Sequence, residues 1–245
     1  AVATVIGQAV SAIIVAPGAA HRPPAPKRLP RYIRQVYFYG YSSILMQLLY
    51  TVYIVALNII LAGFSDAAVT VLGLYYKLQS FFFIPLFGLQ TCVVPVLSFN
   101  YEAGKRERCR ETMRLSFFIS LVFMLAGVIC FVFFPDAMIG IFSQSSEVHA
   151  IGRIAFPIIG AGFFSAVFAL FTPTFFQAIG KGGKSAFLSL LRQVFCLIPL
   201  FYAFSLLGLN ASWIAFPLSE TISGIVGLLL YFVEIRRWKK EEIVL

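Results

Sequence analysis

The sequence predicts an all-α polytopic membrane protein. Of its 245 residues, 60% are hydrophobic and 12% are charged, whereas a typical soluble domain is about 45–50% apolar and about 25% charged. Apolar runs long enough to cross a hydrocarbon core of about 30 Å, which requires roughly 20 helical residues, alternate with short polar gaps. A β-barrel would instead show alternating segments of about ten residues, so helices are the better way to satisfy the backbone in lipid.

We predict a six-helix transmembrane bundle that is preceded, at residues 1–15, by the end of another transmembrane helix. Because the chain begins inside an apolar stretch without a charged leader, we expect it to be a fragment of a longer protein. Residues 16–35 contain five prolines and no acidic residue, which predicts an extended cytoplasmic connector. The bundle occupies residues 36–233, and a cytoplasmic tail follows at 234–245. The six spans are predicted near residues 36–62, 69–99, 115–135, 150–178, 185–207 and 212–233.

The Lys and Arg residues occupy alternate gaps between these spans. The basic gaps are 16–35, 100–114, 179–184 and the tail after residue 233, and the gaps without Lys or Arg are 63–69, 136–150 and 206–212. Cytoplasmic loops carry an excess of Lys and Arg, so we expect the basic gaps and the C-terminus on the cytoplasmic side of the plasma (inner) membrane. The net charge of +9 does not indicate nucleic-acid binding, because the basic residues are confined to the gaps.

The sequence shows no signature of catalysis or of metal binding. Its four cysteines are far apart without a CxxC pair, so we expect free thiols rather than a zinc site or a disulfide framework. The histidines, His21 and His149, lie in gaps, no two acids share a span, and no HExxH, GxSxG or P-loop occurs. We therefore expect a protein that is not an enzyme and that binds neither a metal nor a cofactor.

Polar residues inside the spans are candidate site residues, because a charge near the bilayer centre costs at least about 2.5–3.5 kcal/mol. In the first span, helical spacing places Gln47, Thr51 and Asn58 on one stripe, which either lines a pathway or hydrogen-bonds between helices. In the second span, Lys77 shares a small, polar face with Ser80. Lys77 either points into an aqueous cavity or extends to the external headgroups.

Two further charged residues lie inside later spans. Arg192 lies about two turns from the cytoplasmic end of its span, so it either lines a cavity or extends to the membrane surface. Glu220 is the only carboxylate well inside a span. A desolvated carboxylate can bind a proton near neutral pH, which makes Glu220 a candidate cation-coupling site. The alternatives are a structural acid paired with a neighbouring helix and a solvated acid near the external surface.

Two segments carry a likeness to a known family. Residues 73–109 contain the pattern G-x-Q-x-x-x-x-P-x-x-x-x-N-Y-x-A-G, and residues 177–181 read QAIGK. The residues of the pattern are Gly88, Gln90, Pro95, Asn100, Tyr101, Ala103 and Gly104. These segments resemble the C-terminal lobe of multidrug and toxic compound extrusion (MATE) transporters, in particular the MepA/DinF-like branch, and the likeness covers nearly the whole chain.

The resemblance implies one lobe of a twelve-helix, two-lobe antiporter that expels amphipathic, often cationic compounds in exchange for protons or sodium ions. Residues 1–15 would end the sixth helix, and 16–35 would join the lobes. The expected partners are then the lipid bilayer, small amphipathic substrates and a missing N-terminal lobe. In some branches, acids in the seventh and tenth helices bind the coupling cation. Here the seventh helix has Gln47 and Asn58 and the tenth has no carboxylate, so coupling is expected on the missing lobe or, alternatively, at Glu220.

Two other functions stay open. A lipid-linked oligosaccharide flippase of related fold would want more cationic residues along its cavity, for which Lys77 and Arg192 are the only hints. A non-transporting membrane scaffold or enzyme subunit would leave the polar stripes facing lipid or helix contacts without a pocket. Whether the stripes of spans 36–62, 69–99 and 185–207 converge on one concave surface distinguishes a transporter from a scaffold.

Overall fold

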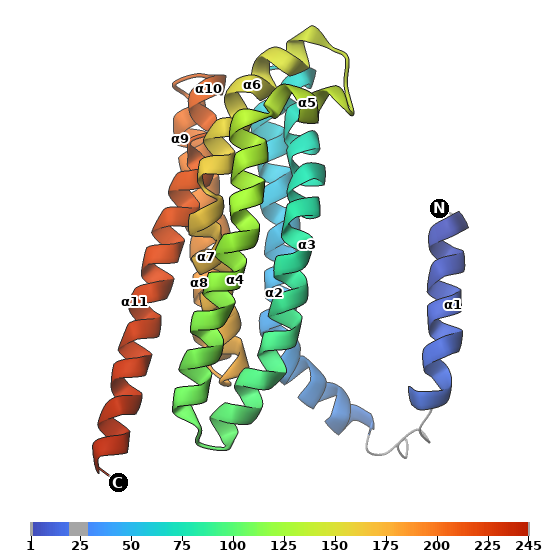
Figure 1. The fold of residues 1–245 in the computed structure, drawn as a ribbon. Coiled ribbons are helices and arrows are strands. Elements are labelled where there is room, and N and C mark those ends of the chain that lie inside the picture. The colour runs from blue at the N-terminus through green and yellow to red at the C-terminus, as the bar shows by residue number, and fades with distance from the viewer. Residues whose placement is uncertain (1, 20–28, 245) are drawn as a thin grey trace. The chain divides into compact units, whose positions relative to one another are not determined.

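The computed structural model describes residues 2–19 and 29–244, in two units whose relative placement is not determined (Figure 1). The first unit, Ala1–Tyr41, contains α1 (Val2–Ala19) and the beginning of α2 (Leu29–Ala62). The second unit, Ser42–Leu245, contains the rest of α2 and all later helices. Each unit is therefore a separate object, and the candidate site lies within the second.

The predicted connector is helical where it can be described. Pro30 lies in the first turn of α2, where proline is tolerated because its missing N–H has no helical partner. Residues 29–35 are therefore helical, which corrects the extended conformation predicted for them. Residues 20–28 of the connector, with His21, lie outside the described residues.

Regular structure in the described part of the second unit consists of helices without strands, which confirms the all-α prediction. After α2 the elements are α3 (Asp66–Glu102), α4 (Arg106–Phe133), α5 (Pro135–Gly140), α6 (Ser146–Ala161), α7 (Phe163–Ala178), α8 (Gly182–Leu190), the π-helix η2 (Leu191–Leu197), α9 (Ile198–Ser205), α10 (Leu209–Ser212) and α11 (Ala215–Val244). The long helices lie side by side in a bundle (Figure 1).

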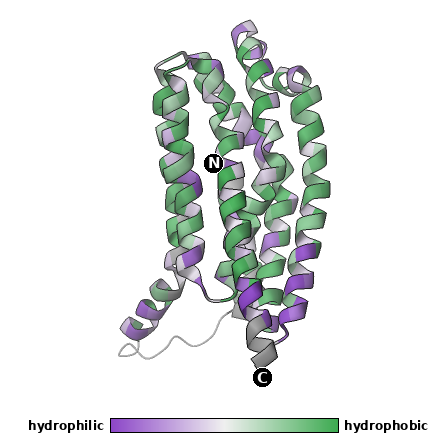
Figure 2. Cartoon of the chain, turned by 90° about the vertical axis from the view of Figure 1, so that its left-hand side faces the viewer, coloured by the Kyte–Doolittle hydropathy of each residue, from purple (hydrophilic) through white to green (hydrophobic). Residues whose placement is uncertain are grey.

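Most of the predicted spans correspond to helices of membrane-crossing length. α3, α4 and the combined segments Gly182–Ser205 and Leu209–Lys239 are each long and apolar enough to cross a membrane. α6 and α7 meet the same requirement as one pair bent by 50°. The described apolar part of α2, Gln47–Ala62, is shorter. Figure 2 shows hydrophobic residues along the bundle and more hydrophilic residues near its ends, which is the pattern of a multi-pass membrane protein.

The bend between α6 and α7 occurs at Gly162, where α11 packs closely. A Cβ atom at Gly162 would lie 2.8 Å from the Cα atom of Pro217. A side chain at this position would therefore push the two helix backbones apart. The predicted span 150–178 is thus divided into two helices near its middle.

The predicted span 185–207 contains a π-helical segment. At the end of η2, the N–H of Ile198 donates to the carbonyl of Gln193, five residues earlier. In a regular α-helix, the ring of Pro199 would clash with the carbonyl of Phe195, and its missing N–H would leave that carbonyl unpaired. The wider helix immediately before Pro199 relieves this conflict. Such π-helical segments are frequently found at functional sites.

Aromatic packing holds the interior of the second unit together, while large apolar side chains also cover its outside. The ring of Phe131 is fully buried, with centroids 4.8 Å from Phe163 and 5.1 Å from Phe156. On the outside, Phe81 of α3 is 70% exposed and Phe118 of α4 is 65% exposed. Contiguous exposed apolar surface is rare on soluble proteins and indicates a surface that contacts lipid or another protein.

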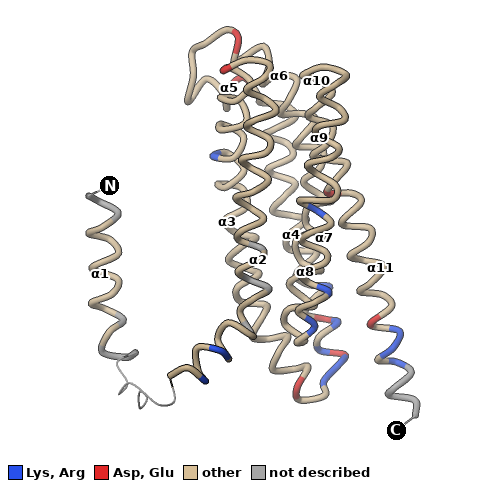
Figure 3. Tube along the Cα trace, turned by 180° about the vertical axis from the view of Figure 1, so that it is seen from behind, with Lys and Arg blue, Asp and Glu red and all other residues tan. Residues whose placement is uncertain are grey.

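The basic gaps of the second unit meet at one end of the bundle (Figure 3). Lys181 and Lys184, from the turn before and the start of α8, both bind Glu234 of α11, and the Lys184 Nζ atom lies 2.9 Å from Oε2. The Arg106 guanidinium lies over the rings of Tyr101 and Trp238, at 3.7 and 5.1 Å from their centroids. These contacts join the basic ends of α3, α4, α8 and α11.

Candidate functional site

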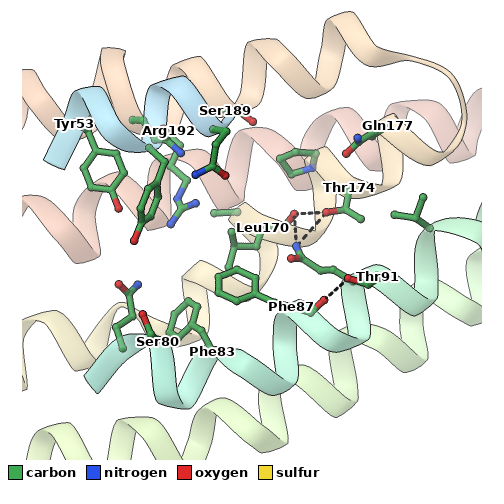
Figure 4. A pocket seen from close by; sticks show the side chains of 18 residues that line it. Tyr53, Ser80, Phe83, Phe87, Thr91, Leu170, Thr174, Gln177, Ser189 and Arg192 are labelled. Carbon is green, nitrogen blue, oxygen red and sulfur yellow. Dashed lines mark hydrogen bonds between the residues drawn. The ribbon is translucent and has the colours of Figure 1, made fainter. Parts of the chain in front are cut away.

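A cavity of about 560 Å³ lies in the second unit between α2, α3, α7 and the segment formed by α8 and η2 (Figure 4). Its walls combine flat apolar surface with hydrogen-bonding groups. The aromatic side chains are Tyr50, Tyr53, Phe83 and Phe87, the amides are Gln47, Gln79, Gln90, Gln177 and Gln193, and the hydroxyl groups include Ser80, Thr91, Thr174 and Ser189. Among the described residues that line the cavity, Arg192 alone carries a charge.

Arg192 of η2 is held in the cavity wall by Glu220 of α11. The Nε atom of Arg192 lies 3.0 and 2.9 Å from the two carboxylate oxygens of Glu220, and Nη2 donates to Oε1 at 2.6 Å. The side chains are only 17% and 13% exposed. Because the carboxylate offsets the charge of the guanidinium, the wall presents polar groups without a net charge from this pair.

Gln90 joins two walls of the cavity. Its Nε2 atom donates to the carbonyl of Leu170 and to Oγ1 of Thr174, both at 3.1 Å. Thr174 Oγ1 also donates to the Leu170 carbonyl at 2.9 Å. The three groups form a small network that fixes α3 against α7, as the dashed lines in Figure 4 show. Such a network holds the neighbouring side chains in fixed positions around the cavity.

Gln193 follows Arg192 and also lines the cavity. Its residue is only 8% exposed, and its Oε1 atom is buried and accepts no hydrogen bond from the residues that the structure describes. Buried polar atoms in proteins are nearly always paired, so an unpaired acceptor beside a cavity needs an explanation. The cavity wall therefore offers an acceptor at Gln193 beside the guanidinium of Arg192.

The structure brings three of the predicted site residues to this cavity, namely Gln47, Ser80 and Arg192. Glu220 lies behind Arg192 as its ion-pair partner. Thus the pairing of Glu220 with a neighbouring helix, one of the alternatives for this residue, is what the structure contains. The polar stripes of α2 and α3 and the π-helical segment converge on one concave surface.

Three other predicted residues lie elsewhere than in the cavity lining. Thr51 is exposed on α2, and Asn58 donates through Nδ2 to the carbonyl of Ile54 at 2.9 Å. Lys77 is exposed, with its Nζ atom 5.8 Å from the centroid of the Phe142 ring. Asn58 lies eleven residues beyond Gln47, or about 16 Å along the helix. The stripe of α2 is therefore longer than the wall that it contributes.

Several lining residues were missed by sequence reasoning. Gln90 and Gln177 belong to the two segments that carry the family likeness, which was the available signal for them. Gln193 gave no signal of its own, because one amide in an apolar span is equally suited to packing between helices. The pairing of Arg192 with Glu220 was missed because the two residues are 28 positions apart and each was considered on its own helix.

The described residues contain no group of three or more His, Cys, Asp or Glu side chains that could hold a metal ion. Cys92, Cys109, Cys130 and Cys196 are free thiols. At the end of the bundle opposite the basic gaps, His149 lies beside Asp136, whose carboxylate accepts a hydrogen bond from Nε of Arg153. The part of the chain that is described thus offers a binding cavity and no metal cluster.

Comparison with known proteins gives a family match for most of the second unit. The model of the MatE family matches residues 42–203. The chain is 25% identical over 206 residues to the multidrug export protein MepA of Staphylococcus saprophyticus, covering 81% of this chain and 44% of that protein. It is 21% identical over 202 residues to MepA of Staphylococcus aureus strain N315, covering 82% and 44%. The chain thus spans less than half the length of these relatives.

Solved structures show the same fold. A multidrug resistance MATE family transporter of the MOP superfamily, in an outward-facing conformation, matches with a TM-score of 0.79 and 22% identity, over 89% of this chain and 49% of that one. A MATE structure in complex with MaD5 matches with a TM-score of 0.82 and 20% identity, over 97% and 55%. A MOP superfamily transporter from Pyrococcus furiosus matches with a TM-score of 0.78 and 22% identity, over 89% and 49%.

Proposed function

The chain belongs to the MatE family, and on that premise we propose that it forms one lobe of a secondary transporter that exports amphipathic compounds across a membrane. The observation that carries this proposal is the cavity between α2, α3, α7 and the α8–η2 segment. Its volume of about 560 Å³ falls in the range of about 300–1,000 Å³ that is typical of small-molecule sites. Its mixture of aromatic and amide groups suits amphipathic molecules, which have an apolar body and a few polar groups.

A second lobe would supply the opposite wall of the pathway. The relatives and solved structures are about twice as long as the part that this chain matches. Transporters built from two repeats bind their substrates between the repeats and move one repeat against the other. The described chain would then provide a rigid wall, in which the Gln90 network fixes α3 to α7 and the Arg192–Glu220 pair fixes η2 to α11.

We propose that the coupling cation, a proton or a sodium ion, binds on the other lobe. The described residues that line the cavity include no carboxylate, and Glu220 is engaged by two nitrogen atoms of Arg192. A cation at Glu220 would have to displace this guanidinium, which a mostly buried ion pair resists. An acid on the second lobe would face no such competition.

The basic end of the second unit supports a cytoplasmic location for the 100–114 and 179–184 turns and for the end of α11. These segments carry the Lys and Arg residues, and the positive-inside rule assigns such loops to the cytoplasm. The opposite end, with α5 and Asp136, would then face the outside. In this orientation the exposed phenylalanines of α3 and α4 face lipid.

Two alternative functions gain less support. A flippase would want several cationic residues along the cavity, but Arg192 is the one charged residue among the described lining residues, and Glu220 offsets it. A scaffold would leave the polar stripes without a pocket, whereas α2, α3 and η2 share one.

The test is export by the full-length protein in a bacterial host that lacks its own exporters, measured as reduced accumulation of a fluorescent amphipathic dye such as ethidium. We expect export by the wild type and its loss in Thr91→Trp, because the larger ring would fill the cavity. Phe99→Trp is the matched control, since Phe99 lies on the same helix and is 70% exposed on the outside. Absence of export by the wild type, or equal export by both variants at equal expression, would contradict the proposal.

A further inference from the structure

On the assumption that this cavity is a transport site, we propose that it selects uncharged aromatic ligands that carry an amide-like group. The ligand carbonyl would accept a hydrogen bond from Arg192, and the ligand N–H would donate to Gln193. This assignment concerns the chemistry of the ligand and goes beyond the proposal that the lobe takes part in export.

Arg192 has hydrogen-bond donors that the protein leaves unused. A guanidinium has five N–H groups, and Glu220 engages only those of Nε and Nη2. Nη1 donates to no residue in the described part of the chain. Figure 4 shows the Arg192 guanidinium extending into the cavity near Tyr53. Its free donors can therefore reach a ligand that occupies this space.

Gln193 supplies the complementary group. Its Oε1 atom is buried within a residue that is only 8% exposed, and among the described residues it has no donor. A ligand N–H in the cavity would give this atom the partner that buried acceptors almost always have. Because Gln193 directly follows Arg192 in η2, a donor and an acceptor from one helical turn line the same cavity. An amide group presents the matching acceptor and donor on adjacent atoms.

The charges around the site favour a neutral ligand over an ion. A carboxylate ligand would have to compete with Glu220 for Arg192, which is already bound at 2.6 Å. A cationic ligand would find the Arg192 guanidinium and no lining carboxylate among the described residues. An uncharged amide avoids both conflicts, since it uses only the donors of Arg192 that Glu220 leaves free.

Aromatic residues provide the surface for the body of the ligand. The rings of Tyr50 and Tyr53 meet edge to face, with centroids 5.4 Å apart and an interplanar angle of 88°. Phe83 and Phe87 lie on the facing wall, with centroids 6.1 Å apart. Flat rings of a ligand stack well against such surfaces. The proposed ligand is therefore an aromatic carboxamide or lactam.

The test compares three fluorescent probes that share one aromatic body: naphthalene-2-carboxamide, 2-naphthoate and (2-naphthylmethyl)trimethylammonium. Binding to the purified full-length protein in lipid nanodiscs is measured by fluorescence anisotropy. We expect the carboxamide to bind about tenfold more tightly than either ion, which is the effect of about one buried hydrogen bond on affinity. Gln193→Met keeps the length of the side chain but removes the acceptor, and it should abolish this preference.

The matched control is Gln79→Met, which makes the same change at another lining amide, and it should keep the preference. The ranking of the three probes on the wild type needs no variant, so it holds even if Gln193→Met folds poorly. Equal or tighter binding of either ion, no binding of the carboxamide, or an unchanged preference in Gln193→Met would overturn the inference. Dye export by the wild type is measured separately. If export persists while the preference is absent, this inference fails and the proposed function stands.

Discussion

Arg192 of η2 and Glu220 of α11 form an ion pair in the wall of the cavity, with Nη2 of Arg192 2.6 Å from Oε1 of Glu220. The two residues come from helices that are separated by α9 and α10 in the sequence. The pair stabilises the contact between these helices and neutralises the only charge among the described lining residues. It therefore affects both the stability of the lobe and the chemistry of the site.

Breaking this pair from one side should strongly destabilise the protein. Glu220→Ala leaves a mostly buried guanidinium without its partner, and we expect the free energy of unfolding to fall by about 3–5 kcal/mol. The double variant Arg192→Met with Glu220→Leu removes both charges and should lose much less. Unfolding of the full-length protein in detergent measures both. Equal losses in the single and double variants would show that the pair has no such role.

Glu220→Gln tests where the coupling cation binds. This variant keeps the shape of the side chain and removes the carboxylate, so export driven by a proton or sodium gradient should persist if coupling lies on the other lobe. The measurement is gradient-driven dye transport by the full-length protein in vesicles. Loss of the gradient dependence, with binding of the dye retained, would place the coupling site at Glu220.

Gly162 should tolerate no side chain. In Gly162→Ala the new Cβ atom would lie 2.8 Å from the Cα atom of Pro217, and overpacking of this kind costs about 1–3 kcal/mol. The control is Gly183→Ala in α8, where nothing lies within 4 Å of the new atom, and where alanine favours the helix by up to about 1 kcal/mol. Thermal unfolding of both variants checks the prediction, and an undisturbed Gly162→Ala protein would contradict the close packing of α7 on α11.

Asp136 should make the end of the bundle opposite the basic gaps sensitive to acid. The hydrogen bond from Arg153 lowers the pKa of the Asp136 carboxyl below its usual value. Because the folded-state pKa is the lower one, this stabilisation is present above the usual Asp value of about 3.9 and is lost as the pH falls through the folded-state value. Unfolding midpoints measured across this range should fall less in Asp136→Asn than in the wild type. Parallel curves for the two proteins would exclude the effect.

The helices could be predicted from the sequence because membrane spans are defined by length and hydrophobicity. The predicted span 69–99 corresponds to α3 at Asp66–Glu102, within a few residues at each end. The bend at Gly162 and the π-helical turns of η2 could not be predicted in this way. Both depend on a neighbouring backbone or on local proline geometry, which an average over about 20 residues does not record.

The candidate site was predictable only where one helix carried its own signal. Gln47 and Ser80 lie on polar stripes, and helical spacing identified them. Spacing cannot say where along a stripe the neighbouring helix approaches, so Thr51 and Asn58 were included although they lie outside the lining. Gln193 became visible only when its buried oxygen and the cavity were seen together.

The central claim, that the cavity is a water-accessible pathway inside a lipid-embedded bundle, is tested most directly at two adjacent residues of α3. Ser80 lines the cavity, whereas Phe81 is 70% exposed on the outside of the bundle. In a cysteine-free full-length protein in membranes, a charged, membrane-impermeant thiol reagent should modify Ser80→Cys and stop dye export, and it should leave Phe81→Cys unmodified. Modification of Phe81→Cys as fast as Ser80→Cys, or export unaffected by modification at position 80, would contradict the account.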